Sequence, residues 1–311
     1  MLAVIGENVV DLLPEPNGLY RPCLGGSPLN VAIGAARQQI KVSYISPLSQ
    51  DAFGTAFADY LAKNAVIYGL DYLSSKPTSL AMVSIDAHQQ PQYSLYRTGI
   101  ADRDISAKTQ IAALPADCKL LHLGSLALES DDAPRIRQVV AAAKAKGIQI
   151  ALDINIRLNA VTNVAAYRAF VLEMLSHSDY IKASDEDLAL LYGHIPVTEA
   201  AAAIRQAAPA AMLALTKGEH GATLFWQQHN LQRPVIKASR FIDTVGAGDT
   251  FWANLLAALL QLGLPDAQHV SADTLMACLT RAMLAASLNI ACKGCNPPTA
   301  DELKQALAQL D

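Results

Sequence analysis

The chain has 311 residues, of which 52% are hydrophobic and 17% charged, so it can bury a large core in one or two domains. A formal net charge of −4 argues against nucleic acid or an anionic membrane as a standing partner. We expect a cytoplasmic protein, because the five cysteines are scattered, no export signal opens the chain, and no stretch is apolar enough to cross a bilayer.

The first hundred residues mix helical and strand patterns. Residues 1–14, "MLAVIGENVVDLLP", predict a first strand, and residues 78–98 alternate with the two-residue rhythm of a half-exposed antiparallel hairpin. Two stretches predict helices: 30–39 and 51–64. We expect the strand-rich segments 11–27 and 67–103 to form a small, discontinuous β-lid that covers a site.

From residue 118 onward, short apolar runs alternate with helical stretches. The predicted strands are 118–124, 148–155 and 178–183, followed by a strand, a glycine turn and a strand over 211–226. The predicted helices are 131–147, 163–176 and 184–193, the last with Ser184 as N-cap. This alternation predicts an α/β domain, formed by 1–10, 28–66 and 104–311, with a mainly parallel sheet and helices on both faces.

Polar residues lie at or just after the carboxyl ends of several apolar runs: Asp11, Asp153, Asn155, Lys182 and Ser184. Each of them alone is typical of a cap or a turn. Ligands of such sheets bind at the carboxyl ends of the strands, so the shared position favours a binding site there.

The segment "DTVGAGDTF", residues 243–251, precedes an apolar helix. Gly246 and Gly248 would let backbone amides approach a ligand, and the start of a helix favours an anion. Asp249 could then accept the proton of an attacking hydroxyl as a phosphate reaches the amides. An ordinary glycine turn explains the spacing equally well. The pattern matches neither the P-loop nor the dinucleotide-binding motif.

A second glycine pair, Gly25 and Gly26, precedes the predicted helix that carries Asn30. A polar ligand could lie against this backbone and bond to the Asn30 amide. Helix capping by Ser27, with Pro28 at the first helical position, accounts for the same residues. The "CKGC" of residues 292–295 lacks a second cysteine pair or a histidine cluster, which disfavours a metal site.

Taken together, "GGSPLNVA" and "DTVGAGDTF" resemble the two signature regions of the ribokinase-like, or PfkB, family of carbohydrate kinases. The segments "GENVVDLLP", "YRTGIAD", "DINIR", "IKASDEDLALLYG" and "LTKGEHGA" follow the order of that family. The resemblance spans nearly the whole chain and is strongest to the fructokinase-like branch. It implies a central, mostly parallel sheet flanked by helices, with a small β-sheet lid.

The resemblance also implies a role for individual residues. Asp249 would be the catalytic base, and the amides of Gly246, Ala247 and Gly248 would bind the transferred phosphoryl group. The residues implied for the sugar are Asp11, Gly26, Asn30, Arg97 and Arg157. Those implied for ATP are Lys182, Ser184, Thr216, Gly218, Gly221 and Asn289. Asp187 would be tied to Mg²⁺, and Asp243, Val245 and Gly294 would form a loop for a monovalent cation such as K⁺.

Two motifs depart from the family pattern. The family's Asn-x-x-Glu appears here as Ser184 and Asp187, and a tryptophan usual after the "DxNxR" motif is missing. Arg97, at the end of the predicted hairpin, would by position alone be a solvated residue that contributes little to stability. The resemblance instead places it above the sugar.

The implied function is an ATP-dependent kinase that phosphorylates a primary hydroxyl of a small sugar, with fructose as first choice. The rival substrates are ribose, a nucleoside, aminoimidazole riboside and 2-keto-3-deoxygluconate. A sugar- or nucleotide-sensing protein without turnover is the non-enzyme alternative, which the intact Asp249 and glycines disfavour. The free edge of the lid also suggests a homodimer.

Overall fold

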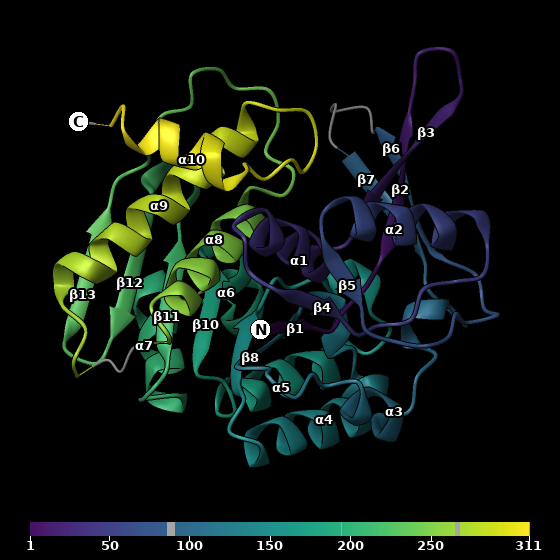
Figure 1. The fold of residues 1–311 in the computed structure, drawn as a ribbon, viewed down its shortest axis with the longest axis horizontal. Coiled ribbons are helices and arrows are strands. Elements are labelled where there is room, and N and C mark those ends of the chain that lie inside the picture. The colour runs from purple at the N-terminus through teal and green to yellow at the C-terminus, as the bar shows by residue number, and fades with distance from the viewer. Residues whose placement is uncertain (86–90, 194, 265–267, 311) are drawn as a thin grey trace.

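A nine-stranded sheet forms the centre of the computed structural model, which describes all residues except 86–90, 194, 265–267 and 311 (Figure 1). In spatial order its strands are β13 (His229–Arg233), β12 (Ala222–Trp226), β11 (Met212–Thr216), β10 (Tyr180–Ser184), β9 (Gln149–Asp153), β8 (Leu120–Gly124), β1 (Leu2–Val4), β4 (Val42–Tyr44) and β5 (Val66–Tyr68). The strands pair in parallel, except that β12 is antiparallel to both of its neighbours. The predicted mainly parallel sheet is therefore confirmed.

Helices cover both faces of this sheet. One core contains α1 (Ser27–Arg37), α2 (Ala52–Lys63), α8 (Ala247–Gln261) and α9 (Ala272–Ile290). The other contains α4 (Ala133–Ala145), α5 (Val164–Leu175), α6 (Asp185–Tyr192) and α7 (Val197–Ala207). Short helices complete the chain: α3 (Ala107–Ala112) beside α4, α10 (Ala300–Leu307) against α9, and the 3-10 turns η1 (Ala101–Arg103), η2 (Ser125–Leu128), η3 (Ser130–Asp132), η4 (Leu158–Ala160) and η5 (Gly218–His220).

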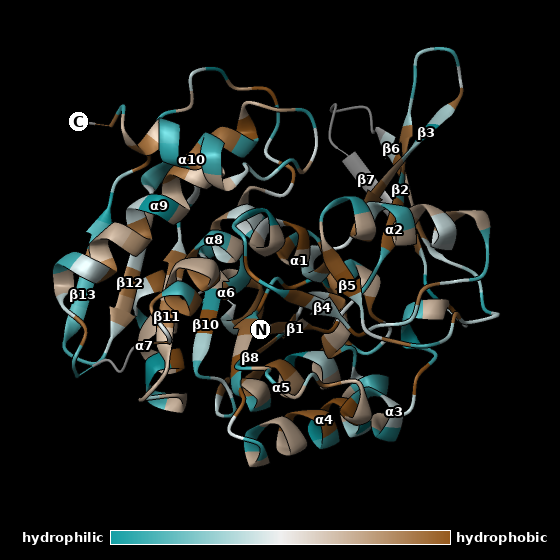
Figure 2. Cartoon of the chain, in the orientation of Figure 1, coloured by the Kyte–Doolittle hydropathy of each residue, from teal (hydrophilic) through white to brown (hydrophobic). Residues whose placement is uncertain are grey.

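Alternation along each strand explains why two cores form. In β1, Leu2 and Val4 belong to the first core and Ala3 to the second, and in β10 Tyr180 and Ile181 divide in the same way. Because successive side chains of a strand point to opposite faces, a short apolar run serves both cores at once. Figure 2 shows hydrophobic colours on most strands of the large sheet, whereas its edge strand β13 is largely hydrophilic.

A separate four-stranded sheet has the order β3 (Tyr20–Gly25), β2 (Val9–Pro14), β6 (Ser79–Ile85) and β7 (Pro91–Tyr96). The strands β6 and β7 pair antiparallel, as the alternation over 78–98 predicts, while residues 86–90 lie outside the described part of the chain. The prediction of a single first strand over residues 1–14 is wrong. The chain leaves the large sheet after β1 and enters the small sheet as β2, and between them Gly6 passes so close that a Cβ there would lie 2.1 Å from Pro28 Cγ.

The division into two domains stays a prediction, and its ranges include the undescribed residues. No helix in the described part of the chain has the length and apolar character needed to cross a membrane.

Helices α1 and α8 pack in unusually close contact. Gly34 of α1 faces Ala253 of α8, and a Cβ on Gly34 would lie only 2.6 Å from the Ala253 Cβ. One helical turn earlier on each helix stand Asn30 and Asp249, which are joined by a hydrogen bond. The missing side chain at Gly34 therefore sets the distance between the two helices at the level of that bond.

We predict that Gly34→Ala destabilises the protein by about 1–3 kcal/mol, because an added methyl group in a packed contact forces the helices apart. The melting temperature should fall by several degrees, measured by thermal unfolding. Ala253→Gly removes the opposing methyl group, so the loss caused by Gly34→Ala should be smaller in that background. Equal losses in both backgrounds would show that the contact does not limit the helix spacing.

Candidate active site

Asp249 is the centre of the polar cluster at the start of α8. Its side chain is buried, and both carboxylate oxygens accept hydrogen bonds from α1. The Ser27 hydroxyl donates to Oδ1 at 2.7 Å, and the Asn30 amide Nδ2 donates to Oδ2 at 2.8 Å. The carboxylate is therefore held in one orientation at the mouth of the helix. The structure thus brings together two of the expected site residues from distant parts of the chain.

Ser27 was missed as a site residue because its position at a helix start suggested capping. The helix begins at Ser27 itself, its N-cap is Gly26, and no side chain caps it. The expected capping role is therefore wrong, and the hydroxyl is free to bond to Asp249. A Cβ on Gly26 would lie 2.3 Å from the carbonyl oxygen of Glu7, so this position needs glycine for a close approach of two backbones.

The glycine turn before α8 has the form that an anion site requires. Gly246 is the N-cap with φ of 72°, and a Cβ there would lie 2.3 Å from the Sγ of Cys295. The Ala247 N–H donates to the carbonyl oxygen of Thr244 at 3.1 Å, so this amide already has its hydrogen-bond acceptor within the turn. Helix starts leave other amides without intrahelical partners, and these can bind an anion.

Lys182 brings a positive charge to this turn. Its Nζ lies 3.4 Å from the position that a Cβ of Gly248 would occupy. The ammonium group also contacts both carboxylate oxygens of Asp153 at 2.8 and 2.9 Å, and both side chains are buried. The pair follows from the sheet, since Lys182 of β10 and Asp153 of β9 are register partners. A buried amine needs such a partner to stay charged.

Asp187 accepts a backbone hydrogen bond on each of its carboxylate oxygens. It is buried, its Oδ1 accepts the Ile156 N–H at 2.8 Å, and its Oδ2 accepts the Ser184 N–H at 2.8 Å. With Ser184 it forms a capping box at the start of α6, which confirms the predicted N-cap. Asp187 therefore has a structural role at this helix start, and its expected tie to Mg²⁺ stays a prediction. Among the residues that the structure describes, no group of three acidic, histidine or cysteine side chains could hold a metal ion.

Arg97 is buried and not solvated, which corrects the expectation that it contributes little to stability. Only 7% of it is exposed. Its Nη1 contacts Asp102 at 2.9 Å and its Nε contacts Glu129 at 3.2 Å. These contacts join the end of β7 to the segments around η1 and η3. Glu7, a buried acid that the sequence reasoning missed, interacts electrostatically with Arg97, and burial is the main cause that raises its pKa to about 7.

The loop expected to bind a monovalent cation is held by several hydrogen bonds. Asp243 accepts the Val245 N–H at 2.6 Å through one carboxylate oxygen and the Gly294 N–H at 2.7 Å through the other. The Val245 carbonyl accepts the Asn289 amide at 2.8 Å. Each of these oxygens keeps a second lone pair, so the residues still fit a monovalent cation.

Asn289 does not lie on a nucleotide-binding surface. Its side chain is fully buried and is bonded within the protein, which corrects the expected place beside the adenine. Of the other residues expected for ATP, Lys182 and Ser184 lie in β10, Thr216 ends β11, Gly218 begins η5 and Gly221 follows it. Thr216 donates to the Ala183 carbonyl at 3.4 Å, a Cβ on Gly221 would meet the Arg233 carbonyl at 2.1 Å, and Gly218 faces open space.

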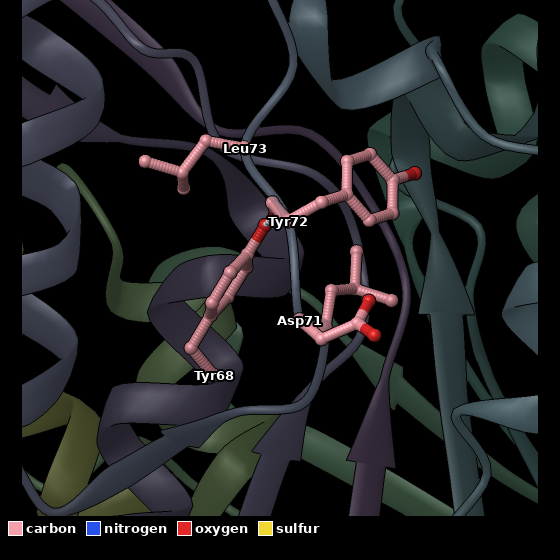
Figure 3. Close-up of a pocket in the computed structure, with 5 residues that line it drawn as sticks. Tyr68, Asp71, Tyr72 and Leu73 are labelled. Atoms are coloured by element: carbon pink, nitrogen blue, oxygen red, sulfur yellow. Dashed lines mark hydrogen bonds between the residues drawn. The ribbon is translucent and has the colours of Figure 1, made fainter.

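The remaining residues expected for the sugar differ in exposure. Arg157 is exposed, with its guanidinium donating to the carbonyl oxygen of Ile156 at 2.9 Å. Asp11 of β2 is partly buried, and this burial raises its pKa to about 6. A surface pocket beside β5 contains none of the expected site residues; it is lined by Tyr68, Leu70, Asp71, Tyr72 and Leu73 (Figure 3).

Comparison with known proteins gives one family and several relatives. The model described as pfkB family carbohydrate kinase matches residues 20–302. A fructokinase of Klebsiella pneumoniae is 32% identical over 272 residues, which are 85% of this chain and 85% of that protein. The fold is similar to that of a fructokinase from Xylella fastidiosa solved with bound ATP, with a TM-score of 0.88 and 23% identity over 99% of this chain and 98% of that one. It is also similar to an aminoimidazole riboside kinase from Salmonella enterica, with a TM-score of 0.83 and 22% identity over 98% of this chain and 99% of that one.

We predict that Arg97→Ala lowers the free energy of unfolding by about 3–5 kcal/mol, because it leaves Asp102 buried without its ion-pair partner and removes one of the two arginines that contact Glu129. Thermal unfolding measures the loss. Arg137→Ala is the matched control. Like Arg97, Arg137 donates from two nitrogens to carboxylate oxygens, here those of Glu173, but it does so on the surface. The control should leave the melting temperature nearly unchanged. Equal shifts in the two variants would contradict a structural role of the buried pairs.

Proposed function

Because the chain belongs to the pfkB family of carbohydrate kinases, we propose that it transfers the γ-phosphoryl group of ATP to fructose and forms fructose 6-phosphate. The choice of fructose is supported by the 32% identical fructokinase. The structural neighbours are less than 25% identical and support the fold alone. The observation that carries the catalytic proposal is the orientation of Asp249 by Ser27 and Asn30 at the start of α8.

In the proposed mechanism Asp249 accepts the proton of the attacking sugar hydroxyl. The free amides at the start of α8 and the ammonium group of Lys182 stabilise the negative charge of the phosphoryl group during in-line transfer. Mg²⁺ would neutralise the phosphates of ATP, and it is commonly held by those phosphates and water with few protein ligands. A monovalent cation in the loop of Asp243 and Val245 would add positive charge near the same turn.

The sugar would lie between the small sheet and the carboxyl ends of the central strands. Asp11 of β2 and Asn30 of α1 would contact its hydroxyls from two sides. Asn30 already donates to Asp249, so it would link sugar recognition to the catalytic base. The small sheet would exclude water, which competes as a phosphoryl acceptor. Arg97 is engaged with Asp102 and Glu129, so its effect on the sugar would come from the position of β7.

The location and assembly of the protein are further proposals. A cytoplasmic place is supported by the free state of all five cysteines. A homodimer through the small sheet is supported by its edge strand β3. Leu19, just before this strand, is 62% exposed, and Tyr20, its first residue, is 43% exposed. Light scattering at micromolar concentration tests this assembly, and a wholly monomeric protein would exclude it.

Turnover of ATP with a panel of acceptors tests the function. We expect the highest kcat/KM for fructose, against ribose, a nucleoside, aminoimidazole riboside and 2-keto-3-deoxygluconate. Asp249→Asn, which keeps the shape but removes the base, should lower kcat by about 10²–10⁴ with little change in sugar binding. A different preferred sugar would overturn the choice of fructose. Binding of sugar or nucleotide without turnover would instead indicate a sensor.

The pKa of Asp11 generates a pH prediction. The carboxylate form accepts hydrogen bonds from sugar hydroxyls, and with a raised pKa of about 6 this form is lost as the pH falls through that value. We expect kcat/KM for the sugar to fall below about pH 6, by up to tenfold per pH unit. Asp11→Asn should lower kcat/KM at neutral pH and remove this acidic limb. An unchanged limb in the variant would assign it to another group.

A further inference from the structure

Asn289 stands in the last turn of α9 and is completely buried. Its Nδ2 donates to the Val245 carbonyl at 2.8 Å. Its Oδ1 accepts the Thr250 hydroxyl at 3.2 Å and the Asn296 N–H at 2.7 Å. One amide group therefore bonds to both ends of the segment 245–250 and to the loop that contains Asn296.

Two of these bonds flank the glycine turn. Val245 directly precedes Gly246, and Thr250 directly follows Asp249. The Asn289 amide thus bridges the two ends of the segment that contains the proposed anion-binding amides and the proposed base. Its third bond ties this bridge to the loop that carries Cys295, whose Sγ packs against Gly246.

The turn needs such a support. Gly246 and Gly248 have wide conformational freedom, and Val245 is 50% exposed, so side-chain packing holds its entrance only weakly. Stabilisation of a transferring phosphoryl group depends on donors that are already in place, and small displacements are costly. Thr250 is fully buried, which gives the bridge a fixed anchor on α8.

We propose that Asn289 is a positioning residue for phosphoryl transfer, which holds the turn at 246–249 in its reactive shape through the bond to Val245. Asn289 itself touches neither sugar nor ATP. This inference rests on the proposed kinase function of the same site. In this role the buried side-chain amide on α9 holds the backbone donors and Asp249 in fixed positions relative to each other.

The variants Asn289→Asp and Asn289→Ala separate the bonds. The aspartate keeps an acceptor for Thr250 and Asn296 but loses the donor to Val245, whereas the alanine loses all three bonds. We expect kcat with fructose to fall about 10- to 100-fold in both variants, with KM for fructose within about threefold of the parent. The aspartate variant is the sharper test, because its fold retains more of the native contacts.

Gln110→Ala is the matched control for stability. Gln110 is also a fully buried amide, it donates to the Ile45 carbonyl at 2.9 Å, and it lies in α3, away from the turn. We expect this control to lower the melting temperature while kcat stays within about twofold. If an Asn289 variant fails to fold, Thr250→Val removes the other anchor of the bridge and should show the same selective loss of kcat.

Folded Asn289 variants with kcat within threefold of the parent would overturn the inference, as would a fall in kcat no larger than that of the control at equal loss of stability. A parent protein that phosphorylates none of the sugars would instead refute the proposed function, so the two failures are distinguishable.

Discussion

The close contact between α1 and α8 is the constraint from which the candidate site follows. The two helices are more than 200 residues apart in the chain, yet the absence of a side chain at Gly34 lets them approach until Ser27 and Asn30 reach the carboxylate of Asp249. The start of α8 then faces the end of β10, where Lys182 meets Gly248. The sheet supplies the second half of the site because β9 and β10 are adjacent and in register. Packing geometry thus comes first, and the polar contacts depend on it.

Buried charges occur where segments from different parts of the fold meet. Lys182 and Asp153 pair at the end of the large sheet, and Arg97 joins the small sheet to Asp102 and Glu129. Removing such groups from water costs free energy, and their mutual attraction offsets this cost only when the geometry is good. Pairs of this kind favour one arrangement of the segments over others.

Much of the fold was predictable because short-range patterns carry it. The alternation of apolar runs and helical stretches after residue 118 predicted the strands and helices there, and the Ser184 cap appeared as expected. The break between β1 and β2 was not predictable, since it depends on how Gly6 passes Pro28 in three dimensions. Similarly, sequence spacing identified the residues Asp249, Asn30 and Lys182 but not their bonds. The burial of Arg97 and Asn289 was not predictable, because a pattern shows that a polar residue is present but not which buried partners it satisfies.

The small sheet is assembled from two separate parts of the chain. Strand β2 pairs with its sequence neighbour β3 on one side and with β6, which begins 65 residues after β2 ends, on the other. It therefore cannot be exchanged between related proteins as one cassette. A chimera that receives only 67–103 from a relative would pair a foreign β6 with the resident β2, and mismatched side chains would meet along that shared ladder. Side chains that face each other across this ladder are therefore encoded in two distant stretches of the gene.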